Sequence, residues 1–171
     1  MISQNKYLNL FLTSNALIII DQFTKFLVTL HIPQNYSVGV ILNFFQFTHI
    51  RNAGVAFGLF ADSDVQYKAM FFIIFSSIAI IAILVFYHQT SNDQKLVQVG
   101  LILLFSGAIG NLIDRVLYHE VIDFLDFYYK NYHWPAFNIA DSCITIGVVL
   151  VLIDQFMNGE KPASQESSHS V

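Results

Sequence analysis

The chain alternates between long apolar runs and polar connections, and four runs are rich in Ile, Leu, Val and Phe. A helix of roughly 20 mostly apolar residues is long enough to cross the hydrocarbon core of a bilayer. We therefore predict four transmembrane helices, at about residues 8–30, 69–87, 96–113 and 138–156. The first of them carries two charged residues, Asp21 and Lys25, in its second half.

The connections between these runs differ in kind. Residues 31–67 contain a stretch of aromatic and β-branched residues, Ile41 to Ile50, which predicts a strand or hairpin at the membrane surface. Residues 114–136 hold several Tyr and a Trp, which are typical of membrane interfaces. We expect a mainly helical membrane protein with a small β-rich platform between the first two helices, a single domain over residues 1–157, and a polar flexible tail over residues 158–171.

Composition supports a membrane protein. Hydrophobic residues make up 55% of the 171 residues and charged residues only 12%, about half the share in soluble domains. The net charge of −4 and the absence of a basic patch argue against nucleic acid as a partner. The single cysteine, Cys143, excludes an intrachain disulfide and CxxC motifs, and its apolar helix predicts a buried, inert thiol.

Four spans place both termini on one side of the membrane and most of the polar side chains on the other. Ionisable groups at such depths are costly, so each of them is a candidate functional residue. Three Lys or Arg lie on the side of the termini and five on the opposite side. This charge count alone leaves the orientation open.

Two polar groups lie on the first and third predicted helices. Asp21 and Lys25 are four residues apart and share a helix face, where they form either part of a site or a structural ion pair with Lys25 reaching outward. Asn111, Asp114 and Arg115 follow a run of small residues that allows close helix packing. A structural Asp114–Arg115 pair is the simpler interpretation, although the Arg115 fork also suits a carbonyl or phosphate.

Two further groups involve aspartates. Asn138 and Asp141 begin a polar stripe on the fourth helix, which fits either a site or a helix cap. Asp123 and Asp126 have apolar neighbours, which raise a carboxyl pKa and allow two carboxylates to share one proton, unless both are solvated in a loop. An HExxH-like segment begins at His119 but lacks its second His, so we expect no metal. An aspartyl hydrolase and a proton- or ion-coupled transporter both remain possible from these residues.

Five short motifs occur in a fixed order between about residues 15 and 155. They are Asp21–Lys25 (DQFTK), Asn52–Phe57 (NAGVAF), Gly107–Arg115 (GAIGNLIDR), Val121–Phe124 (VIDF) and Phe137–Asp141 (FNIAD). Each motif alone is weak, but together they make the chain resemble the bacterial lipoprotein signal peptidases, the signal peptidase II family of aspartyl membrane peptidases.

This resemblance implies a metal-free and cofactor-free endopeptidase of the bacterial inner membrane. Such an enzyme removes signal peptides from diacylglyceryl-modified prolipoproteins by cleaving before the lipidated cysteine. It implies cytoplasmic termini, a site near the periplasmic surface, contact with membrane lipid, inhibition by globomycin-like peptides, and a monomer. The catalytic pair that activates water maps to Asp123 and Asp141. Substrate-binding or site-supporting positions map to Asp21, Lys25, Asn52, Gly54, Gly107, Asn111, Asp114, Arg115, Asn138 and Ala140.

The resemblance also gives a hypothesis for individual roles. We expect Asn138 to orient Asp141, and Arg115 with Asn52 to hold the substrate backbone or its lipid-linked end. An apolar pocket between the helices would accept the diacylglycerol chains. Residues 31–67 would lie on the membrane and clamp the substrate.

Overall fold

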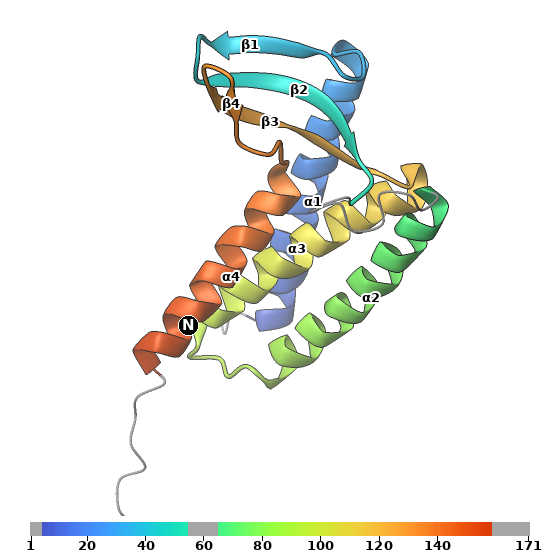
Figure 1. The fold of residues 1–171 in the computed structure, drawn as a ribbon. Coiled ribbons are helices and arrows are strands. Elements are labelled where there is room, and N and C mark those ends of the chain that lie inside the picture. The colour runs from blue at the N-terminus through green and yellow to red at the C-terminus, as the bar shows by residue number, and fades with distance from the viewer. Residues whose placement is uncertain (1–4, 55–64, 159–171) are drawn as a thin grey trace, which may run out of the picture.

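The computed structural model describes residues 5–54 and 65–158, and it contains the four predicted membrane-spanning helices. They form a bundle (Figure 1) of α1 (Lys6–His31), α2 (Val65–Gln89), α3 (Lys95–Tyr118) and α4 (Ile139–Asn158). All four are long and apolar enough to cross a membrane. Residues 159–171 of the predicted flexible tail and residues 55–64 of the 31–67 connection lie outside the described residues.

Four antiparallel strands in the order β1-β2-β3-β4 stand at one end of this bundle (Figure 1). They are β1 (Ser37–Ile41), β2 (Phe45–Asn52), β3 (Val121–Tyr129) and β4 (Tyr132–His133). The hairpin predicted between the first two helices is present as β1 and β2. The sheet is wider than expected, however, because β3 and β4 come from the connection between α3 and α4.

The third helix extends to Tyr118, so the predicted end at residue 113 is wrong. The charges of Asp114 and Arg115 end the uncharged run, but Asp114 is fully buried and paired with Lys25. A charge neutralised inside the protein does not require the helix to stop at the membrane boundary. The helix instead ends at His119, whose left-handed backbone (φ 64°) donates its N–H to the Arg115 carbonyl.

Helix α3 is central and contacts each of the other three helices. Its closest neighbour is α4, because small residues face each other along the two helices. A Cβ on Gly100 would lie 2.9 Å from the Gly147 carbonyl oxygen, and a Cβ on Gly107 would overlap the Ala140 carbonyl. This close packing places the last turns of α3 beside the first turn of α4.

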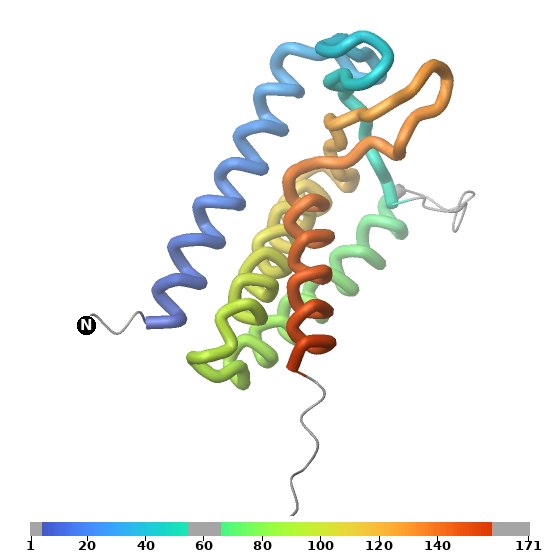
Figure 2. Tube along the Cα trace, turned by 90° about the vertical axis from the view of Figure 1, so that its left-hand side faces the viewer, coloured from blue at the N-terminus to red at the C-terminus, as the bar shows by residue number. Residues whose placement is uncertain are grey.

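The remaining surface of the helices is apolar. Side chains such as Ile19, Phe75 and Ile146 are more than half exposed, as expected for surfaces that face lipid. At the end of the bundle opposite the sheet, Lys6 Nζ donates to the carbonyl oxygens of Tyr87, His88 and Thr90. The start of α1, the end of α4 and the α2–α3 connection all lie at that end (Figure 2).

Candidate active site

Asn138 connects the two predicted catalytic aspartates. It directly precedes α4, and its Oδ1 accepts from the backbone N–H of Asp141 at 2.9 Å, while Asp141 Oδ2 accepts from the backbone N–H of Asn138 at 3.2 Å. This reciprocal arrangement is a capping box, which satisfies the first N–H groups of a helix. Asn138 Nδ2 donates to Asp123 Oδ1 at 2.8 Å. One fully buried side chain therefore contacts both acids.

Asp123 lies in β3 and is buried, with only 2% of its surface exposed. Its second oxygen, Oδ2, accepts from Asn52 Nδ2 at 2.9 Å. The pKa of Asp123 is raised from its usual range to about 7, mainly by burial, and the nearby charge of Asp141 acts in the same direction. The hydrogen bonds from Asn52 and Asn138 act in the opposite direction and lower the pKa. The buried position of Asp123 therefore favours the protonated form of its carboxyl group.

Asp141 is held from α3 as well as by its own helix cap. Asn111 Nδ2 donates to Asp141 Oδ1 at 2.7 Å, and Lys25 Nζ donates to Asn111 Oδ1 at 3.1 Å. An ammonium group has only donors, so this contact fixes which end of the Asn111 amide faces Lys25. The amide N–H group of Asn111 must then face the Asp141 carboxylate.

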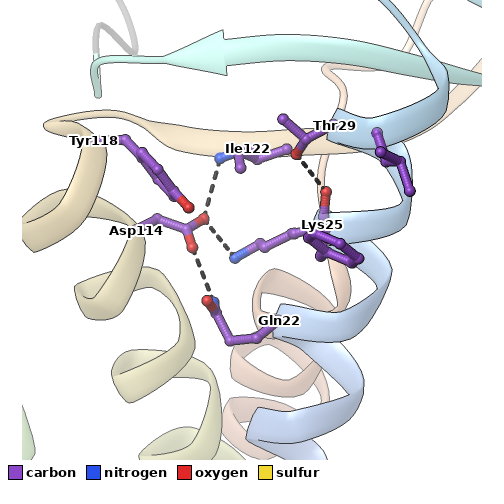
Figure 3. A pocket seen from close by; sticks show the side chains of 8 residues that line it. Gln22, Lys25, Thr29, Asp114, Tyr118 and Ile122 are labelled. Atoms are coloured by element: carbon purple, nitrogen blue, oxygen red, sulfur yellow. Dashed lines mark hydrogen bonds and ion pairs between the residues drawn. The ribbon is translucent and has the colours of Figure 1, made fainter.

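Lys25 pairs with two buried acids, and Figure 3 shows its pair with Asp114. Lys25 Nζ lies 2.8 Å from Asp21 Oδ2 and 2.8 Å from Asp114 Oδ2. The predicted Asp21–Lys25 pair is present, but Lys25 is buried and does not reach outward. The predicted Asp114–Arg115 pair is wrong, because successive residues of a helix do not face each other. Asp114 instead also accepts from Gln22 Nε2 at 2.9 Å and from the Ile122 backbone N–H at 3.1 Å.

Asp21 links α1 to the first turn of α4. Its Oδ1 accepts from the Ala140 backbone N–H at 2.9 Å, which satisfies a second N–H group at the helix start. Gly110 allows this approach, because a Cβ there would lie 2.7 Å from Asp21 Oδ2. Gly110, which was not among the predicted site residues, therefore acts by permitting close contact between the α3 backbone and a buried carboxylate.

The turn after β2 presents Asn52 to Asp123. Asn52 Oδ1 accepts from the Gly54 N–H at 2.8 Å, which orients its amide nitrogen toward Asp123. Gly54 has φ +84°, a left-handed conformation that favours glycine. That Asn52 also holds the substrate stays a prediction, since its amide nitrogen carries a second N–H besides the one that faces Asp123.

Arg115 borders a pocket of about 350 Å³ between α2, α3 and α4. Asn111 and Asp141 line the same pocket, and its remaining wall is mainly apolar, with Phe72, Phe75, Ser76, Ala79, Ile83, Leu104, Ala108 and Ile144. Arg115 Nη1 donates to the Asn111 carbonyl at 3.4 Å, a long hydrogen bond that, among the residues that the structure describes, leaves most N–H groups of Arg115 available. The pocket therefore joins an acid, a guanidinium group and an apolar wall.

Asp126 belongs to a different cluster. It is buried in β3, where its Oδ2 accepts from Gln46 Nε2 at 2.6 Å and its carboxylate contacts His133 Nδ1. The alternative that Asp123 and Asp126 form a solvated loop pair is wrong, because both lie buried in a strand with separate partners. Cys143 is buried, as predicted.

Two residues near the site were not predicted from the sequence. Gln22 donates to Asp114, to Asp21 and to the Gly110 carbonyl, and its position beside Asp21 was the only signal for it. Phe72 lies under Arg115, but an aromatic residue within an apolar span carries no signal of its own.

Known proteins share both the sequence and the fold. A family model described as Signal peptidase (SPase) II matches residues 13–157. The lipoprotein signal peptidase of Desulforapulum autotrophicum is 46% identical over 147 residues, which cover 86% of this chain and 91% of that protein. The lipoprotein signal peptidase of Geobacter sulfurreducens is 45% identical over 85% of this chain and 90% of its own length.

Two solved structures have a similar fold. A bacterial membrane enzyme determined by the in meso method at 2.3 Å resolution matches with a TM-score of 0.78 and 36% identity over 94% of both chains. A second, at 1.9 Å resolution, has a TM-score of 0.75 and 40% identity over 85% of this chain and 90% of that one. With its four spanning helices and its match over residues 13–157, the chain belongs to the signal peptidase II family and is a multi-pass membrane peptidase.

Proposed function

We propose that the chain is an aspartic endopeptidase that removes signal peptides from diacylglyceryl-modified prolipoproteins, cutting before the lipidated cysteine. The observation that carries this proposal is the buried pair Asp123 and Asp141, which come from different elements and are held by Asn138. The similarity to the two lipoprotein signal peptidases supports the substrate class. The transporter alternative is not favoured, because the matched family is a peptidase family.

The two aspartates divide the acid and base roles. Asp123, with a pKa of about 7, carries the shared proton and donates it to the carbonyl oxygen of the scissile bond. Asp141 acts as the base that takes a proton from the attacking water. Because each carboxylate accepts N–H donors on both oxygens, the pair is held in position before the substrate binds.

The neighbouring pocket fits a substrate that is partly lipid and partly peptide. Its apolar wall suits acyl chains or an apolar signal segment, and Arg115 at its polar end suits a peptide carbonyl. The sheet at the same end of the bundle carries exposed apolar side chains, among them Val38, Leu42 and Phe44. These side chains would hold the sheet against the membrane surface, where a lipidated substrate arrives.

The same proposal sets the location and organisation of the protein. The chain would lie in the bacterial inner membrane as one domain over residues 1–157, with cytoplasmic termini and the aspartates near the periplasmic surface. It would act as a monomer without a metal or cofactor, and globomycin-like peptides would compete with the substrate for the pocket.

The test is cleavage of a diacylglyceryl-modified prolipoprotein by the purified chain with a chelator present. The wild type should cleave before the lipidated cysteine, as mass spectrometry of the products would show. Asp123→Asn and Asp141→Asn should each lose about 100-fold or more of the rate. Asp126→Asn is the matched control, a buried acid of the same strand with separate partners, and should stay active.

Other outcomes would redirect the assignment. If Asp123→Asn or Asp141→Asn remained active, the catalytic pair would have to include Asp114 or Asp126. If a folded wild-type chain failed to cleave the lipidated substrate, the transporter alternative would return. Cleavage of the unlipidated precursor at the same rate would contradict the proposed role of the diacylglyceryl group.

A further inference from the structure

Phe72 of α2 contacts two separate parts of the candidate site. The guanidinium carbon of Arg115 lies 5.1 Å from the centre of the Phe72 ring, within the range of a cation–π interaction. The Phe72 ring also fills the space beside Gly54. A Cβ added to Gly54 would overlap one ring carbon and lie 2.7 Å from two others. Phe72 also lines the pocket that contains Asp141.

The contact with Arg115 limits how the guanidinium can move. An arginine side chain is long and loses considerable rotamer freedom when it is held in one position. The hydrogen bond from the Arg115 guanidinium to the Asn111 carbonyl, at 3.4 Å, is too long to hold the group firmly. The face of the Phe72 ring is therefore a main determinant of the guanidinium plane, and so of the direction of its free N–H groups.

The contact of Phe72 with Gly54 affects the surroundings of the Asp123 carboxylate. The Gly54 N–H holds Asn52 Oδ1, and the same amide group donates to Asp123. With Phe72 packed against Gly54, the turn cannot move toward α2. The position of the ring thus limits where the Asn52 donor can lie relative to Asp123.

We propose that Phe72 is a positioning residue of the peptidase, which sets the orientation of Arg115 and of the Asn52–Gly54 turn from the face of α2. This inference rests on the proposed function. It gives α2 a role in positioning site residues, in addition to its role as part of the apolar wall for the substrate.

The experiment compares cleavage by Phe72→Leu, Phe72→Tyr and Phe75→Leu with the wild type, using the lipidated prolipoprotein in detergent. Leu keeps an apolar side chain but removes the aromatic face, whereas Tyr keeps it. Phe75 is the matched control, because it lines the same pocket and is not the ring that Arg115 contacts. Phe72→Leu should lower kcat about three- to thirtyfold with little change in KM, and Phe72→Tyr should stay within about threefold of the wild type.

A structural wall would behave differently. If Phe72 only lined the pocket, both Leu variants would raise KM and leave kcat unchanged, and this result would overturn the proposal. Equal rates for Phe72→Leu and the wild type, or a Tyr variant as slow as the Leu variant, would overturn it too. Thermal unfolding in the same detergent would identify a misfolded variant, and Phe72→Met, with a similar volume and no ring, would then replace Phe72→Leu.

Coupling to Arg115 gives an independent measurement. If the ring acts through the guanidinium, Phe72→Leu should lower kcat by a smaller factor in an Arg115→Lys background than in the wild type. Additive effects would contradict that route. A wild-type chain that does not cleave would overturn the proposed function itself, whereas active wild type with an unaffected Phe72→Leu overturns only this inference.

Discussion

Asn138 both caps α4 and binds Asp123. Its backbone N–H and side-chain oxygen complete the cap of α4, and its side-chain nitrogen holds Asp123. The spacing of Asn138 and Asp141 indicated either a cap or a site, and the structure shows that it is a cap which also holds the second carboxylate. The sequence could not show this, because the contact with Asp123 depends on how β3 lies beside residues 137 and 138, which precede α4.

The pH dependence of cleavage follows from the raised pKa of Asp123. A pKa of about 7 in the folded protein means that the proton is present below pH 7 and is lost as the pH rises above it. Removing it leaves two negative charges in the pair and no acid for the carbonyl oxygen. We expect kcat to fall as the pH rises through about 7 and to fall again at low pH, when both acids are protonated. A rate profile that is flat across both titrations would contradict the shared proton.

Asn52→Ala tests the donor on Asp123. The hydrogen bond from Asn52 lowers the pKa of Asp123, so its loss should raise that pKa and move the alkaline limb of the rate profile to higher pH. We also expect kcat to fall about tenfold or more, as for loss of a hydrogen bond to a charged group. Gln46→Ala is the control, since Gln46 lies in the same strand and donates to Asp126 instead. An unchanged pH profile and rate for Asn52→Ala would remove this role.

Lys25 is the cation on which the buried acids depend. Lys25→Met would leave Asp21 and Asp114 without their ion pair in a buried site, and would free the Asn111 amide to rotate. Breaking a buried pair by removing one partner costs about 3–5 kcal/mol. We expect a clearly lower midpoint of thermal unfolding and a slower enzyme, whereas Lys95→Met, at an exposed position, should leave both unchanged. A Lys25→Met variant with the unfolding midpoint of the wild type would contradict this role of Lys25.

At the scale of the elements, the apolar runs predict all four helices. Polar residues within the apolar pattern led to a wrong end for α3, and β3 and β4 were not predicted. The charges of Asp114 and Arg115 end the third apolar run of the sequence, but the helix continues because Asp114 is buried beside Lys25. Strand β3 was assigned to a connection because Asp123 and Asp126 interrupt its apolar pattern. Its pairing with β2, Gln46 opposite Asp126 for example, joins residues 80 positions apart, which a local pattern cannot show.

The close packing of α3 on α4 is an element-scale requirement of the site. A Cβ at position 107 would overlap the Ala140 carbonyl, so Gly107→Ala should push the start of α4, with Asp141, away from Asn111. Overpacking of this kind costs about 1–3 kcal/mol, and we expect a lower unfolding midpoint together with a reduced kcat. Gly39→Ala is the matched control, because nothing lies within 4 Å of a Cβ there. Wild-type rate and stability for Gly107→Ala would show that the helices can separate without harm.

At the scale of the whole molecule, the bundle has two unlike ends. The sheet occupies one end, and the start of α1, the end of α4 and the α2–α3 connection occupy the other (Figure 1). The charge count suggested the opposite orientation to the proposed one, by five basic residues to three. The structure explains why this count carries little information: Lys25 and Lys6 are bound within the protein, and Arg51 and Arg115 lie over aromatic rings.

Orientation can be measured with single cysteines at the two ends. Cys143, which is buried, would be replaced by Ala, and Cys would then be placed at Tyr132 in the β4 hairpin or at Asn92 in the α2–α3 connection, both exposed. If the termini are cytoplasmic, a membrane-impermeant maleimide should label Tyr132→Cys in spheroplasts, and Asn92→Cys only in inverted membrane vesicles. The reverse pattern would place the acids at the cytoplasmic surface, on the wrong side for a substrate already exported. Because both probes lie outside the site, each variant should still cleave, which ties the measured orientation to an active enzyme.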